Sequence, residues 1–139
     1  MQDNINKTEY ILGIDYGDAK IGLAIADSET RMAFSYGTLS NDKDLLHDIL
    51  DIIKKEKIKT VVIGIPKRLK DKKNEYVSQE LGDEIIKSGK ALVEYQDEIY
   101  STKIARENLK EKGMKNISQF DHEESARIIL DSFLQKKAL

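Results

Sequence analysis

Two acidic side chains stand directly after short apolar runs, where a folded chain could present them to a ligand. Asp15 closes the run Tyr10-Ile-Leu-Gly-Ile-Asp15, and Glu98 follows the run that ends Tyr95-Gln-Asp-Glu98. Carboxylate oxygens at strand ends can hold a divalent cation such as Mg²⁺ or Mn²⁺. Asp15 is also typical of a hairpin turn, and Asp97 and Glu98 are also typical of a solvated loop. Only one of Asp97 and Glu98 can face the site if the strand continues, because side chains alternate.

A third ligand is expected from the last predicted helix, which offers Asp121, His122, Glu123 and Glu124. At about 100° per residue, the buried stripe of this helix is defined by Ala126, Ile129, Leu130 and Phe133. His122 lies near the middle of that stripe, Glu123 at its edge, and Asp121 and Glu124 well off it. Asp121 and Glu124 fit a capping box instead. We therefore predict His122 as the ligand, with a hydrogen-bonded core histidine as the alternative.

A basic stretch follows the only proline of the chain. Lys67-Arg-Leu-Lys-Asp-Lys-Lys73 has five basic residues in seven and comes directly after Pro66. Such a loop, with Lys67 and Arg68 foremost, suits a phosphate backbone. A solvated loop without a partner is the alternative interpretation.

The elements that must position these residues can be read from the periodicity. Apolar runs predict strands at 10–15, 20–26, 31–39, 60–65 and 91–95. Three- and four-residue spacing predicts a first helix that starts after Asn41 as N-cap, and further helices at 74–88, 102–112 and 120–136. Gly89 is a predicted C′ residue.

This order predicts an α/β fold with a five-stranded mixed sheet, formed by a three-stranded antiparallel meander plus parallel strands and flanked by helices. The first, fourth and fifth strands should be parallel because helical crossovers connect the later ones. Asp15, Pro66 and Glu98 would then meet at one edge of the sheet, beyond the carboxyl ends of the strands. A length of 139 residues indicates a single domain, residues 1–139.

Composition excludes several classes of protein. The chain has no Cys, so disulfides, Cys-ligated metals and a thiol nucleophile are excluded. No P-loop motif is present. No signal peptide and no membrane span are expected, and a cytoplasmic location is compatible with the absence of Cys. The net charge of −2 argues against a strongly basic nucleic-acid binder but allows a local basic patch.

The chain resembles the YqgF (RuvX) family over roughly residues 10–135. This family has the RNase H-like fold and is described as Holliday junction resolvases and as pre-16S rRNA nucleases. Four elements carry the resemblance in the right order: the opening hairpin Ile11-Leu-Gly-Ile-Asp-Tyr-Gly17 with Lys20-Ile-Gly-Leu-Ala-Ile-Ala-Asp27, Val61-Val-Ile-Gly-Ile-Pro66, Asp97-Glu-Ile-Tyr-Ser-Thr102, and Ser125-Ala-Arg-Ile-Ile-Leu-Asp-Ser-Phe-Leu134.

Two departures from the family pattern bear on activity. The arginine that follows Asp-Glu in the family is Ile99 here, and the third carboxylate of the family falls on His122. His122 is also the position that lies nearest the middle of the buried stripe of the predicted helix. A neutral nitrogen in place of a carboxylate predicts weaker Mg²⁺ binding and a relative preference for Mn²⁺.

The resemblance implies a metal-dependent endonuclease, a two-metal-ion phosphodiesterase that processes the 5′ end of pre-16S rRNA. Asp15 would bridge two divalent cations, and Glu98 and His122 would complete their shells. Ser101 and Thr102, at a helix start, would bind a phosphate, and Lys20, Lys67 and Arg68 would position the backbone.

Three other functions are considered. A four-way DNA junction in recombination or repair is the alternative substrate, and resolving it would require a homodimer rather than a monomer. A non-catalytic nucleic-acid-binding or ribosome-assembly module is a second alternative, suggested by Ile99 and His122. An actin-like ATPase shares the Gly-Ile-Asp-x-Gly hairpin but needs two copies of the fold, which 139 residues do not supply.

Overall fold

The computed structural model describes residues 8–65, 72–97 and 117–137. Its elements are β1 (Tyr10–Tyr16), β2 (Lys20–Asp27), β3 (Ala33–Ser40), α1 (Leu45–Lys55), β4 (Ile58–Ile65), α2 (Lys72–Ser88), β5 (Leu92–Asp97) and α4 (Ile117–Lys137). The helix predicted at 102–112 lies outside the described residues. Within the described ranges, no helix combines the length and the apolar composition needed to cross a membrane.

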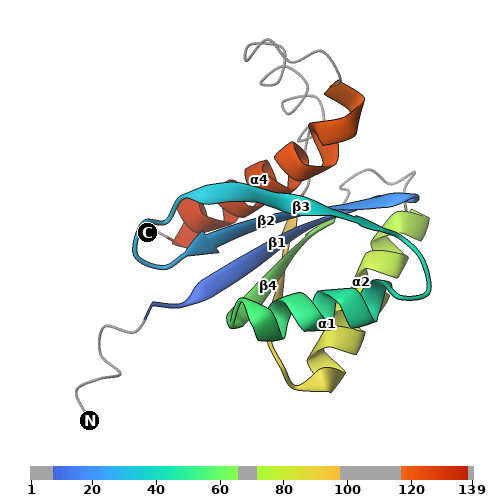
Figure 1. Ribbon diagram of the computed structural model, residues 1–139, viewed down its shortest axis with the longest axis horizontal. Helices are drawn as coiled ribbons and strands as arrows, with labels where there is room; N and C mark the ends of the chain where they lie inside the picture. Colours follow the sequence, from blue (N-terminus) through green and yellow to red (C-terminus); the bar gives the residue numbers. More distant parts are fainter. Residues whose placement is uncertain (1–7, 66–71, 98–116, 138–139) are drawn as a thin grey trace.

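The strands form one five-stranded sheet in the order β3-β2-β1-β4-β5. The β1–β2 and β2–β3 pairs are antiparallel, whereas β1–β4 and β4–β5 are parallel. The predicted meander and the predicted parallel strands are therefore confirmed. Figure 1 shows α4 on one face of the sheet and α1 and α2 on the other.

Two hydrophobic cores fill the space between the sheet and its helices. Strand alternation sends Leu12 and Ile14 of β1 to the core beneath α1 and α2, and sends Val62 of β4 to the core beneath α4. Both cores draw on the central strands β1 and β4, which are buried on both faces. This explains why their sequences read as nearly continuous apolar runs.

The core beneath α4 is built from small residues, so the helix lies close to the strands. A Cβ added at Gly13 would stand 2.9 Å from Leu130 Cβ and 3.1 Å from the Ala126 carbonyl oxygen. Ala24 and Ala26 of β2 complete the floor. Gly13 thus allows α4 to approach β1 closely.

The ends of the first two helices use the left-handed backbone conformation. Gly89 has φ +71° after α2, which confirms its predicted role as a C′ residue. Lys57 has φ +56° after α1, although it carries a side chain. The same conformation is thus reached once by glycine and once by lysine.

The predicted start of the first helix is wrong. Helix α1 begins at Leu45 with Asp44 as N-cap, and no side chain caps it. The side chain of Asn41 instead donates a 2.8 Å hydrogen bond to the Gly17 carbonyl oxygen. Asn41 therefore braces the β1–β2 hairpin, a long-range contact that a local N-cap pattern does not reveal.

Candidate active site

Asp15 lies near the carboxyl end of β1, where the parallel strands of an α/β sheet commonly present ligand-binding residues. The residue is only 4% exposed. It points to the α4 face, since it alternates with Leu12 and Ile14 on the opposite face. A carboxylate buried to this extent needs a proton, a hydrogen bond or a positive partner.

His122 of α4 lies beside the Asp15 carboxylate. Its Nδ1 atom lies 3.6 Å from Asp15 Oδ2, and its side chain is 37% exposed. The structure therefore brings together Asp15 and His122, which the sequence singled out separately. The four residues used to define the buried face of α4 are also buried, as predicted: Ala126, Ile129, Leu130 and Phe133.

Gly22, which the sequence pattern did not single out, allows the backbone of α4 to lie close to the strands beside Asp15. Gly22 pairs with Asp15 across β1 and β2, and a Cβ added to it would lie 1.9 Å from the His122 carbonyl oxygen. Thr38 pairs with Gly22 on the other side and donates a 3.0 Å hydrogen bond to Glu123 Oε2. These three residues, Asp15, Gly22 and Thr38, form one row of the sheet beneath His122 and Glu123 of α4. A glycine within an apolar strand indicates that another backbone or a ligand comes close to that strand. It does not indicate which element of the fold comes close.

The acidic residues near His122 have other partners. Glu123 accepts the hydrogen bond from Thr38. Glu124 is only 3% exposed and accepts hydrogen bonds from Arg127 Nε at 2.6 Å and Nη2 at 3.0 Å. The pKa of Arg127 is raised because Glu124 accepts these bonds, which outweighs the effect of desolvation.

Two predictions about α4 are corrected here. The helix begins at Ile117, so Asp121 and Glu124 are not a capping box at its start. Glu124 was expected well off the buried stripe, yet it is buried. The reason is that α4 crosses β1, β2 and β3, which buries a wider arc of the helix than its apolar residues mark. The ion pair with Arg127 makes that burial tolerable.

We expect Arg127→Met to lower the free energy of unfolding by about 2 kcal/mol, because it removes the ion pair and the two hydrogen bonds that Arg127 makes to the buried Glu124 carboxylate. The value is below that of a fully buried pair because the Arg127 side chain is 26% exposed. Urea denaturation would measure the change. The double variant with Glu124→Gln should recover at least half of the loss, and no recovery would contradict this explanation.

Asp97 and Gln96 lie on opposite faces of the sheet at the end of β5. Gly82 of α2 faces β5 so closely that an added Cβ would lie 3.3 Å from Val93 Cγ1 and closer still to the Tyr95 ring. By alternation, Asp97 lies on this α2 face, away from Asp15. Gln96 is 7% exposed and lies on the same face as Asp15. Glu98 itself lies outside the described residues.

Among the predicted phosphate contacts, only Lys20 falls within the described part of the chain. It is exposed and lies on the α4 face, two positions from Gly22 along β2. Its Nζ atom is 3.5 Å from Ser40 Oγ on β3. Lys67, Arg68, Ser101 and Thr102 lie outside the described residues.

Asp15 and His122 together form a partial donor set for a cation. Among the described residues, no group of three or more His, Asp or Glu side chains is close enough to hold a metal ion. Asp15 and His122 provide two donors whose atoms are 3.6 Å apart. Two ligands of one cation, each at about 2.1 Å, can stand up to about 4.2 Å apart, so this pair fits a shared ion. One carboxylate and one imidazole suit Mn²⁺ better than Mg²⁺.

A sheet in the order β3-β2-β1-β4-β5, with a carboxylate at the end of β1 and a helix laid across it, defines an RNase H-like domain. Two solved structures share this fold. RuvC of T. thermophilus in complex with a Holliday junction substrate superposes with a TM-score of 0.62 at 12% identity, covering 93% of this chain and 96% of that one. The Fowlpox virus resolvase with Holliday junction DNA also gives 0.62, at 10% identity, covering 94% and 99%.

The chain belongs to the RuvX family, whose model, described as Holliday junction resolvase, matches residues 9–136. Two curated relatives carry the name "Putative pre-16S rRNA nuclease". The one from Malacoplasma penetrans is 32% identical, over 95% of this chain and 98% of its own length. The one from Rickettsia conorii is 30% identical, over 89% and 84%.

Proposed function

We propose that this protein is a metal-dependent endonuclease that processes the 5′ end of pre-16S rRNA in the cytoplasm. The observation that carries the proposal is the contact between Asp15 and His122 at the end of β1. Two further findings support it: membership of the RuvX family and the names of the relatives.

In this proposal Asp15 and His122 hold divalent cations together with Glu98, which continues the chain after β5. Asp15 would be shared between two cations in a two-metal-ion arrangement. When bound, such cations make a nucleophile available at neutral pH and stabilise the leaving oxygen of the phosphodiester. Alternation along β5 places Gln96 on the face of Asp15 and Asp97 on the opposite face, which is why Glu98 and not Asp97 is proposed as the ligand.

The remaining assigned residues would hold the substrate. Lys20 is exposed on the face of Asp15, so its ammonium group can contact a phosphate next to the cleaved bond. Lys67 and Arg68 would add contacts from the loop after β4. Ser101 and Thr102 would bind a phosphate through hydroxyl and backbone N–H groups.

A four-way DNA junction is the second candidate substrate. It is favoured by the description of the family model and by the two resolvase structures, which contain Holliday junction DNA. The two substrates can be separated directly because both can be supplied to the same protein under the same conditions.

The test is cleavage of an RNA fragment that spans the 5′ boundary of 16S rRNA, run beside a synthetic four-way DNA junction. We expect cleavage of the RNA with Mn²⁺, slower cleavage with Mg²⁺, and none with a chelator, because His122 replaces a carboxylate. Cleavage of the junction alone would reject the rRNA substrate. Saturable binding of the RNA without cleavage under any cation would reject the enzyme and favour a non-catalytic assembly module.

A further inference from the structure

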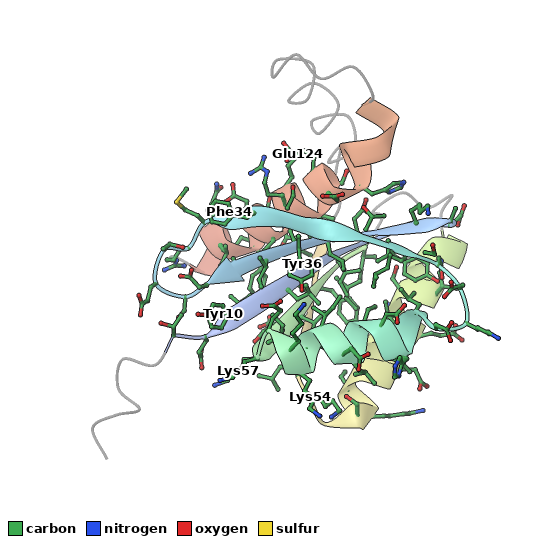
Figure 2. The ribbon with its side chains drawn as sticks, in the orientation of Figure 1. Tyr10, Phe34, Tyr36, Lys54, Lys57 and Glu124 are labelled. Atoms are coloured by element: carbon green, nitrogen blue, oxygen red, sulfur yellow. The ribbon has the colours of Figure 1, made fainter. Side chains whose placement is uncertain are left out.

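A recessed surface lies at the opposite end of the sheet from Asp15. It has a volume of about 600 Å³ and is framed by the start of β1, the start of β4 and the end of α1. We call it the lysine groove, after the six residues that give it its character: Glu9, Tyr10, Lys54, Lys57, Lys59 and Lys90. Figure 2 shows Tyr10, Lys54 and Lys57 at this end of the molecule.

Most of the positive charge in the lysine groove is available to a ligand. Lys59 pairs with Glu9. Within the described part of the chain, no carboxylate lies in ion-pair distance of Lys54, Lys57 or Lys90. Three ammonium groups around one recess repel one another, so an anion would be attracted there.

This charge is specific to the groove and not general to the surface. The recess between α1 and α2 has a similar volume of about 610 Å³ but the opposite composition. Four carboxylates and two lysines line it: Asp42, Glu80, Asp83, Glu84, Lys43 and Lys87. A net charge of −2 for the chain therefore conceals two recesses of opposite sign.

One exposed aromatic ring lies among these lysines. Tyr10 lines the groove and is 38% exposed. Lysines that contact the phosphates, together with an aromatic face on which a base can stack, are typical of sites that bind single-stranded nucleic acid.

Lys57 lines the groove from the C′ position that follows α1. Its φ of +56° is a conformation that favours glycine, as Gly89 shows at the end of α2. Arg31 also adopts this conformation, with φ +57°, so the backbone alone does not mark Lys57 as a binding residue.

We propose that the lysine groove binds a single-stranded stretch of nucleic acid, with phosphates on Lys54, Lys57 and Lys90 and a base stacked on Tyr10. The groove lies five residues along β1 from Asp15, about 17 Å away. It would hold a part of the substrate beyond the cleaved bond. The proposal rests on the proposed function only in taking that strand to belong to the same substrate.

The test measures binding without cleavage. In the Asp15→Asn background, with a chelator present, the affinity for a labelled 12-nucleotide single-stranded RNA is measured at several salt concentrations. We expect Lys54→Gln/Lys57→Gln to weaken binding at least tenfold and to reduce the salt slope by about 1.4, the value for two phosphate contacts on a single strand. The matched control is Lys87→Gln/Lys136→Gln, which removes the same charge outside the groove and should change affinity less than twofold.

Equal weakening by both pairs, or no weakening by the groove pair, would overturn the proposal. Lys57→Gly adds a second check, because it relieves the left-handed backbone. We expect an unchanged or higher melting temperature together with weaker binding. A lower melting temperature with unchanged affinity would make Lys57 a structural residue.

The two proposals can fail separately. If wild-type protein binds single-stranded RNA through the lysine groove but cuts neither substrate, the nuclease proposal fails alone. If cleavage proceeds and the groove pair binds and cuts as the wild type does, the lysine groove proposal fails alone.

Discussion

Replacing Asp15 with asparagine is expected to lower the cation-dependent cleavage rate by about 10³-fold, or about 4 kcal/mol of activation free energy. The amide keeps the shape of the side chain but loses the charge that would hold a cation. The free energy of unfolding should stay within about 1 kcal/mol of wild type, since Asp15 is 4% exposed and a neutral group costs less to bury. Single-turnover cleavage and urea denaturation would measure the two effects.

Asp18→Asn is the matched control for this prediction. This substitution makes the same chemical change three residues from Asp15, on the exposed hairpin turn. Its cleavage rate should stay within about twofold of wild type, since long-range charge effects at an exposed site are screened. Cleavage by the Asp15→Asn variant at the wild-type rate would contradict the proposed role of Asp15.

Gly22→Ala should lower the free energy of unfolding by about 3 kcal/mol. The added Cβ would lie 1.9 Å from the His122 carbonyl oxygen and 2.2 Å from the carbonyl carbon. Backbone atoms cannot rotate away as a side chain can, so α4 must lift from the sheet. Because His122 moves with the helix, cleavage should fall by about 10²-fold as well. Urea denaturation and the cleavage assay would both report the change.

Gly37→Ala is the matched control, since a Cβ at Gly37 meets nothing within 4 Å. It lies on β3 of the same sheet, opposite Leu23. Its stability should stay within about 0.5 kcal/mol of wild type. Equal losses for the two variants would mean that a general cost of replacing a glycine in this sheet, and not the close approach of α4 to Gly22, determines the effect.

The fold could be predicted from the sequence because its signals are local. The apolar runs through Ile14 and Val62 mark central strands, and Gly89 marks a helix end through its own backbone conformation. Parallel pairing then followed from the helical crossovers. The start of α1 could not be predicted in this way, because Asn41 serves a contact with Gly17 on a distant hairpin.

In the candidate site, too, local sequence patterns predicted some residues, whereas residues that depend on distant contacts were missed. Asp15 was marked by its place after an apolar run, and His122 by its place on a helix face. Gly22 and the burial of Glu124 were missed because each depends on which element crosses which strand. Hydrophobic periodicity marks apolar residues, so a buried ion pair such as Glu124 with Arg127 leaves no trace in it.

The packing of α4 has a consequence for how the chain folds. This helix follows every other described element in the sequence, yet it covers β1, β2 and β3, the first strands of the chain. Contacts between such distant segments form late, because the entropy cost of closing a long loop comes before the contacts can stabilise the chain. Until then the α4 face of the meander is open, and Asp15 has no His122 beside it. The proposed catalytic pair, Asp15 and His122, is therefore expected to assemble in the same step that closes the second core, so partly folded chains should not cut nucleic acid.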